Sequence, residues 1–289
     1  MTLVTLALVL SSAVLHATWN LWTKQIGREA GSAALMWTLT AISTLLYAPV
    51  ALAMFAGGGW RPEPGALVWI LGSAVIHVGY FLLLIRGYRA GDLSLVYPVA
   101  RGTGPLLAAL GAMVWFGERP TVLSVAGIAF VVLGLFVLTA RPAASGGRKI
   151  EAGLGYGVAI GAFIALYTLW DGWSVKRIGI PPLLFYWSGE VVRLLLFTPA
   201  AAARREEVAR LWKDHRARVM GIAALSPLSY ILILLALRSG AISHIAPARE
   251  LSILVGAYLG GRVLGEGERT RRLAAAAAFA CGVIALAMA

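Results

Sequence analysis

Four polar residues recur every four positions near the start of the chain, in a stretch that is otherwise apolar. They are Ser12, His16, Asn20 and Lys24, and the last three fall within HATWNLWTK, residues 16–24. Residues four apart lie on one face of a helix, so the spacing predicts a polar stripe. We expect this stripe to form one wall of a cavity in which His16 and Asn20 contact a substrate. Interhelical hydrogen bonds, each worth under about 1 kcal/mol in a membrane, would explain the same stripe.

A second polar stripe occurs in YTLWDGWSVK, which starts at Tyr167. Tyr167, Trp170 and Asp171 stand 151 positions after His16, Trp19 and Asn20. We predict that Tyr167 and Trp170 bind substrate. Asp171 replaces the amide of the first copy, and a carboxylate held away from water can bind and release a proton, so we predict an ion-coupling role for it. A pair with Lys176 or Arg177 is the alternative.

Two prolines are followed by charged residues inside apolar runs. Arg101 comes three residues after Pro98, and Arg249 and Glu250 follow Pro247. Proline removes a helical hydrogen bond and frees a carbonyl, so we expect both helices to be interrupted there. Guanidinium groups bind carboxylates and phosphates through two hydrogen bonds. Arg101 and Arg249 are therefore predicted to contact an anionic or zwitterionic substrate. Glu250 is predicted to act in ion coupling, although it would weaken the substrate prediction if it neutralised Arg249.

Glu190 and Arg193 stand three residues apart near the middle of another apolar run. This spacing lets them pair on one helix face. We predict an ion-coupling role for Glu190, while a structural ion pair facing the bundle explains the same spacing. His77 is alone in its run, and we expect it to make an interior hydrogen bond.

The composition predicts the elements that must position these residues. Of 289 residues, 60% are hydrophobic and 13% are charged, whereas about a quarter of a soluble domain is charged. An apolar helix of about 20 residues spans a bilayer. Ten such runs are present, at 2–24, 32–56, 66–86, 92–116, 121–140, 153–175, 182–203, 218–238, 242–264 and 272–289. We predict an all-α, polytopic membrane protein of ten transmembrane helices, in which the first run is a retained span and not a signal peptide.

The net charge of +12 is concentrated between the runs. The first, third, fifth, seventh and ninth connectors carry 17 Lys and Arg residues, and the others carry 5. The positive-inside rule therefore predicts cytoplasmic odd connectors and outward-facing termini. Orientation and anionic lipid explain the charge better than nucleic acid does. The charged stretch at 203–219 predicts an interfacial helix on the inner leaflet, with a regulatory partner site as the alternative.

The two halves of the chain repeat one another. Besides the two stripes, residues 88–101 match 237–250 at an offset of 149, and FGERPT (116–121) is echoed by EGERTR (266–271). We predict a first five-helix repeat at 1–140, a connecting loop at 141–152 and a second repeat at 153–289. An odd number of spans per repeat makes the second enter the membrane from the opposite side. The expected fold is thus two inverted repeats, with a substrate site between them near the middle of the bilayer.

The chain resembles the drug/metabolite transporter superfamily, in particular its EamA-type members, in three features. These are ten spans in two repeats, HATWN followed by Lys24 in the first span, and G(E)R after the fourth and ninth spans. The resemblance covers the whole chain. It implies a secondary carrier of small metabolites, amino acids, nucleotide-sugars or drugs, and many members are exporters. It also implies a central cavity lined mainly by spans one to four and six to nine. Relatives often have cytoplasmic termini, which differs from the orientation that the charges predict.

We therefore predict a secondary transporter, an exporter or permease, that moves a small polar metabolite by alternating access. The alternative is a lipid-linked flippase or multidrug exporter of the same superfamily. An intramembrane enzyme is a weaker alternative, because the sequence has no HExxH, GxSxG or paired-aspartate motif. We expect no catalytic residue, cofactor or metal, and no nucleic acid partner. The expected partners are the substrate and membrane lipid, for a monomer or homodimer in the inner or plasma membrane.

Overall fold

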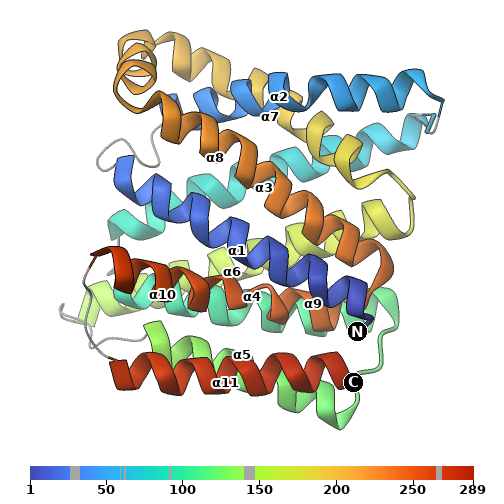
Figure 1. Ribbon diagram of the computed structural model, residues 1–289, viewed down its shortest axis with the longest axis vertical. Coiled ribbons are helices and arrows are strands. Elements are labelled where there is room, and N and C mark those ends of the chain that lie inside the picture. Colours follow the sequence, from blue (N-terminus) through green and yellow to red (C-terminus); the bar gives the residue numbers. More distant parts are fainter. Residues whose placement is uncertain (27–32, 59, 62, 91–92, 140–146, 265–268) are drawn as a thin grey trace.

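The computed structural model describes residues 1–26, 33–58, 60–61, 63–90, 93–139, 147–264 and 269–289. These residues are almost all helical, and they contain no strand. The helices are α1 (Leu3–Ile26), α2 (Ala33–Ala56), α3 (Pro64–Ala90), α4 (Leu93–Phe116), α5 (Val122–Thr139), α6 (Gly147–Lys176), α7 (Pro182–Ala202), α8 (Arg205–Ser239), α9 (Ile242–Ala248), α10 (Leu251–Leu264) and α11 (Arg269–Met288) (Figure 1). The all-α prediction is confirmed.

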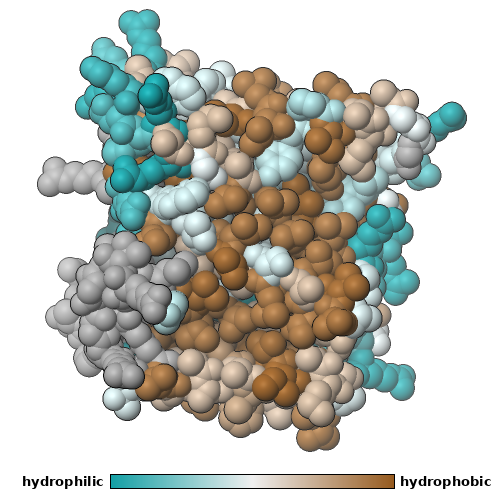
Figure 2. All heavy atoms as spheres, in the orientation of Figure 1, coloured by the Kyte–Doolittle hydropathy of each residue, from teal (hydrophilic) through white to brown (hydrophobic). Residues whose placement is uncertain are grey.

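Six helices in the described ranges are long and apolar enough to cross a bilayer. They are Leu3–Ile26, Ala33–Ala56, Gly65–Ala90, Leu95–Phe116, Ile150–Lys176 and Arg205–Ser239, and Val122–Leu138 and Leu273–Met288 are shorter apolar helices. Figure 2 shows one face of the molecule, on which a broad apolar region lies between more hydrophilic ends. Helices occupy all ten predicted runs, but since six of them meet this criterion, ten crossings stay a prediction.

The helix interruptions predicted at Pro98 and Pro247 occur in the second half of the chain only. The ninth run is divided into α9 and α10, with Arg249 and Glu250 between them. Here the backbone switches to tighter bonds, from Glu250 N to Pro247 O (3.0 Å) and from Ser252 N to Arg249 O (3.2 Å). In contrast, α4 continues as one helix through Pro98 and Pro105. The predicted interruption at Pro98 is therefore wrong, because no such change of bonding accompanies the proline in α4.

The charged stretch before the eighth run is helical and continuous with it. The 35-residue α8 bends at His215, which has φ −131° and ψ 17°. Before the bend, Leu211 and Val208 pack against the ends of α1 and α2, while Trp212 is exposed. Figure 1 shows this first part of α8 turning across the end of the bundle.

The boundary between the predicted repeats lies partly outside the described residues. Residues 141–146 of the predicted connecting loop are not described, and the same holds for residues 266–268 of EGERTR. The remainder of that loop, 147–152, is the first part of α6.

Helix packing pairs elements from the two halves. Helix α1 packs on α8 and α10, and α6 packs on α3 and α4, while α2 packs on α7 and α5 on α11. The α4–α6 contact is close because α6 presents glycine there: a Cβ at Gly161 would overlap Thr103 Oγ1 and lie 3.0 Å from Gly104 N. The Met1 amino group donates to Ala287 O (2.9 Å), so the start of α1 lies beside the end of α11.

Candidate substrate cavity

A cavity with a volume of ≈ 1030 Å³ lies among α1–α4, α6–α8 and α10. Helices α5 and α11 contribute one lining residue each, Leu138 and Arg271. The cavity extends to the last turns of α1 and α3, where Lys24 and Arg89 line it. The basic first part of α8 packs at this same end, against Ile26 at the end of α1.

The opposite end, where the chain termini lie, is closed by polar contacts. Glu118, in the turn after α4, accepts hydrogen bonds from the first amides of α9: Ile242 N to Oε1 (2.8 Å) and Ser243 N to Oε2 (2.9 Å). Lys176, at the end of α6, donates to Gly240 O (2.9 Å). None of these residues lines the cavity. The cavity therefore reaches one end of the bundle, while hydrogen bonds between side chains and backbone join the helices at the other.

The described cavity wall is strongly basic. It holds six Lys or Arg residues and one carboxylate, that of Glu190. The basic residues are Lys24, Arg89, Arg101, Arg193, Arg249 and Arg271. The wall is also aromatic, with tyrosines from five helices: Tyr80, Tyr88, Tyr97, Tyr167, Tyr186 and Tyr230.

The three arginines deep in the bundle have three different partners. Arg193 pairs with Glu190 on its own helix (2.5 Å), as their spacing predicted was possible. Arg101 pairs with Glu250 (3.2 Å), whose side chain is 1% exposed. Glu250 thus makes its close ion pair with Arg101, and it acts on the neighbouring Arg249 only through longer-range electrostatics.

Arg249 differs from Arg101 and Arg193 because it forms no ion pair with a carboxylate of the described residues. Its Nη2 donates to the hydroxyl of Tyr167 (2.7 Å), and the guanidinium lies 5.5 Å from the centre of the same ring. Among the described residues, no carboxylate oxygen lies within the 4.0 Å of an ion pair with this guanidinium. The break between α9 and α10 places the residue at the cavity wall. Such a cation can bind the carboxylate or phosphate of a ligand.

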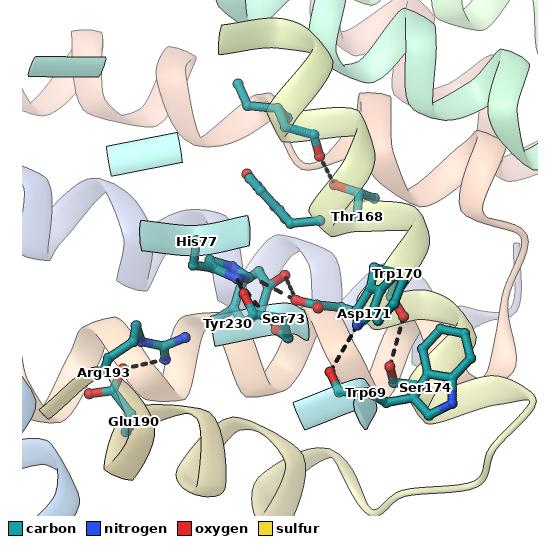
Figure 3. A network of polar contacts seen from close by, with 12 residues as sticks. Trp69, Ser73, His77, Thr168, Trp170, Asp171, Ser174, Glu190, Arg193 and Tyr230 are labelled. Carbon is teal, nitrogen blue, oxygen red and sulfur yellow. Dashed lines mark hydrogen bonds and ion pairs between the residues drawn. The ribbon is translucent and has the colours of Figure 1, made fainter. Parts of the chain in front are cut away.

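Asp171 lies behind the cavity wall and is fully buried. Tyr230 donates to its Oδ2 (2.6 Å), and His77 Nε2 lies 3.8 Å from the same oxygen (Figure 3). Its other oxygen, Oδ1, has no hydrogen-bond partner in the structure. The alternative that Asp171 pairs with Lys176 or Arg177 is wrong, since none of its ion-pair contacts is to either residue and Lys176 binds a backbone carbonyl.

His77 makes the interior hydrogen bond that its position predicts, to the carbonyl of Ser73 (2.9 Å). It also lines the cavity. Its ring stacks on Tyr167, with centroids 4.6 Å apart and planes at 28°, and meets Tyr230 edge-on at 5.7 Å. The Asp171 and Arg249 groups are thereby connected through His77 and Tyr167.

The predicted site residues divide into two groups. Those that line the cavity are His16, Asn20, Arg101, Tyr167, Glu190 and Arg249, and those that do not are Trp170, Asp171 and Glu250. Trp170 instead donates its indole N–H to Trp69 O (2.8 Å). The side-chain amide of Asn20 donates a hydrogen bond to the backbone carbonyl of His16 on its own helix (2.7 Å). Sequence reasoning missed Tyr80, Tyr186 and Tyr230, because an aromatic residue in an apolar run has no feature that distinguishes a cavity from a core.

Comparisons with known proteins agree with this architecture. Residues 3–140 match the EamA-like transporter family. Solved structures match too, 29 chains in all, and one described only as "Crystal structure of protein" has a TM-score of 0.74, with 16% identity over 98% of this chain and 96% of that one. At that identity the likeness shows the fold alone. None of the curated proteins compared with the chain matches it. Residues 3–140 are therefore of the EamA type that the sequence resemblance predicted, and the long apolar helices of the described chain are those of a multi-pass membrane protein.

Proposed function

We propose that this protein is a secondary carrier of a small anionic or zwitterionic metabolite, and that it exports this metabolite by alternating access. The observation that carries the proposal is the charge of the cavity. Of the described residues, six basic side chains and one carboxylate line it, and none of their carboxylates forms an ion pair with Arg249. A charge inside a membrane protein costs several kcal/mol unless a partner or water compensates it. An anionic ligand would supply the partner that the described residues do not.

The proposed binding site is centred on Arg249 and Tyr167. The hydrogen bond from Arg249 to the Tyr167 hydroxyl fixes the guanidinium while leaving its remaining donors available for a carboxylate or phosphate. Arg101 is a second contact, held by Glu250. His16 and Asn20 on α1 are proposed to contact the ligand from the opposite wall. A cationic drug would meet repulsion from the same arginines, so the multidrug alternative fits this cavity less well.

Alternating access is proposed to follow from two inverted five-helix repeats, 1–140 and 153–289, crossing the membrane ten times. The packing supports this arrangement: α1 on α8 and α10 corresponds to α6 on α3 and α4. The cavity reaches the basic end of the bundle, and positive charge favours the cytoplasmic side of a plasma or inner membrane. We propose that the structure corresponds to a cytoplasm-facing state, which an exporter uses to load its substrate.

A ligand-binding experiment tests the proposal. Purified protein in detergent is screened by thermal shift against amino acids, organic acids and phosphonates, each beside its neutral amide or ester. We expect anions to raise the unfolding temperature of the wild type and to lose most of that effect in Arg249→Gln. The control is Arg86→Gln, an exposed arginine of α3 outside the cavity. Equal stabilisation by neutral analogues, or by anions in Arg249→Gln, would show that the assignment is wrong.

A further inference from the structure

We propose that Asp171 and His77 together bind one proton, and that this proton is linked to the anion at Arg249 so that the carrier moves both. The inference rests on the proposed function for its anion, but the proton site is argued from its own contacts. Both residues lie on helices of the cavity wall, His77 on α3 and Asp171 on α6.

Asp171 differs from the other deep carboxylates of the described chain. Glu190 and Glu250 each contact an arginine within 4 Å, whereas the groups around Asp171 are the phenol of Tyr230, the imidazole of His77 and the hydroxyl of Ser73. It is fully buried, and its Oδ1 has no hydrogen-bond partner. Burial disfavours the charged form of a carboxylate that has no fixed counter-ion, so such a group is stabilised when it binds a proton.

The orientation of His77 indicates where that proton is held. Its Nδ1 lies 2.9 Å from the carbonyl oxygen of Ser73, which can only accept a hydrogen bond, so Nδ1 carries the hydrogen of the neutral ring. Nε2 then presents a lone pair to Asp171 Oδ2 at 3.8 Å. Two lone pairs facing one another repel, and a proton on either group makes the contact attractive. The pair is therefore suited to hold one proton, which reaches it through His77, the member that lines the cavity.

Charged and titratable groups face this pair from each helix around it. Tyr167 stacks on His77 from α6, and Tyr230 approaches both members from α8. Arg193, with its partner Glu190, acts on the pair from α7, and Arg249 acts from the break before α10. Arg193 is paired with Glu190, whereas Arg249 has no ion pair with a carboxylate of the described chain, so a bound anion would change the net charge most at Arg249.

This arrangement links the two occupancies. A proton on the pair adds positive charge near Arg249, and the two repel one another until an anion binds to the guanidinium. By linkage, anion binding then favours protonation, and protonation favours anion binding by the same factor. The contact from His77 through Tyr167 to Arg249 gives a second, mechanical connection. When the substrate is a monoanion, the anion and the proton together carry no net charge across the membrane.

Infrared difference spectroscopy tests the proton site without any substrate. Wild-type protein in nanodiscs of phosphatidylcholine and phosphatidylglycerol is titrated across neutral pH. We expect a carboxylic acid C=O band that disappears in Asp171→Asn and changes frequency or midpoint in His77→Gln. The exposed Asp214→Asn is the matched control and should leave the band unchanged. A band that persists in Asp171→Asn, or a wild type without a titrating carboxyl band, would overturn the proton site.

Calorimetry tests the linkage, with benzoate as the anionic probe and benzamide as its neutral analogue. Benzoate binding is measured in buffers of different ionisation enthalpy, which reports the protons taken up. We expect uptake of about one proton per benzoate in the wild type and almost none in Asp171→Asn, so that affinity rises as pH falls. Benzoate binding without proton uptake would overturn the linkage and leave the anion carrier intact. If benzoate does not bind the wild type, the linkage falls with the proposed anion site, and the infrared band alone decides the proton site.

Discussion

At the scale of residues, the three deep arginines differ in how far their partners could be predicted. Glu190 and Arg193 are three positions apart, so the helix repeat alone predicts that they can pair. Arg101 and Glu250 come from opposite halves of the chain, and no local rule links them. The sequence suggested Arg101, Arg249 and Glu250 as candidates without their partners. The fold pairs Glu250 with Arg101, and Arg249 donates a hydrogen bond to Tyr167 instead.

The Arg101–Glu250 pair gives a stability prediction. Replacing Glu250 with Gln leaves Arg101 without its counter-ion, and breaking a buried pair costs about 3–5 kcal/mol. We expect a clear fall in the unfolding temperature of E250Q in detergent. The double variant Arg101→Met with Glu250→Leu should regain much of that loss, since neither charge then remains.

Glu207→Gln is the matched control for this experiment. Glu207 pairs with Arg204 at 3.7 Å, but that arginine is 56% exposed, so the pair is worth at most about 1 kcal/mol. If E250Q and E207Q unfolded at the same temperature, the buried pair would not have the structural role assigned to it.

At the scale of elements, the break between α9 and α10 is what places Arg249 at the cavity. Pro247 was a correct signal for this break, but Pro98 in α4 was a misleading one. Proline removes one donor in both helices, and only the second half follows it with tighter backbone bonds. That choice depends on the surrounding packing, which is why it could not be predicted from proline alone.

The close contact of α4 and α6 gives a second prediction. A methyl group at Gly161 would overlap Thr103, so we expect Gly161→Ala to destabilise the protein by about 1–3 kcal/mol. Gly155 on the same helix has no atom within 4 Å of its would-be Cβ. Gly155→Ala should therefore be neutral or stabilising by up to about 1 kcal/mol. Thermal unfolding in detergent measures both, and equal effects would contradict the close packing described for α4 and α6.

The Glu118 contact gives a third prediction, on the closed end of the bundle. Glu118→Ala removes the acceptor for the first two amides of α9. We expect faster hydrogen exchange at Ile242 and Ser243 and a larger population of conformations open at this end. Glu151→Gln, an exposed change on α6, is the control. Unchanged exchange at both amides would show that Glu118 does not hold this end closed.

At the scale of the whole molecule, the membrane class and the helical runs could be predicted because both depend on composition and length. The sequence could not predict that the cavity reaches only one end, since this depends on which helices are in contact in a given state. It also could not place Trp170 and Asp171 outside the cavity, although Tyr167 of the same stripe lines it. The stripe predicts a shared helix face, but only the packing of α3 and α8 decides how much of that face is covered.

Transport in proteoliposomes measures most directly whether the protein carries an anion and whether this transport depends on Arg249. The radiolabelled form of the anion that gives the largest thermal shift is loaded inside, and its exchange with unlabelled external anion is followed for wild type, Arg249→Gln and the control Arg86→Gln. We expect rapid exchange by wild type and Arg86→Gln, and a loss of at least about tenfold in Arg249→Gln, equivalent to about 1.4 kcal/mol. Exchange by Arg249→Gln at the wild-type rate, with equal transport of the neutral analogue, would contradict this expectation.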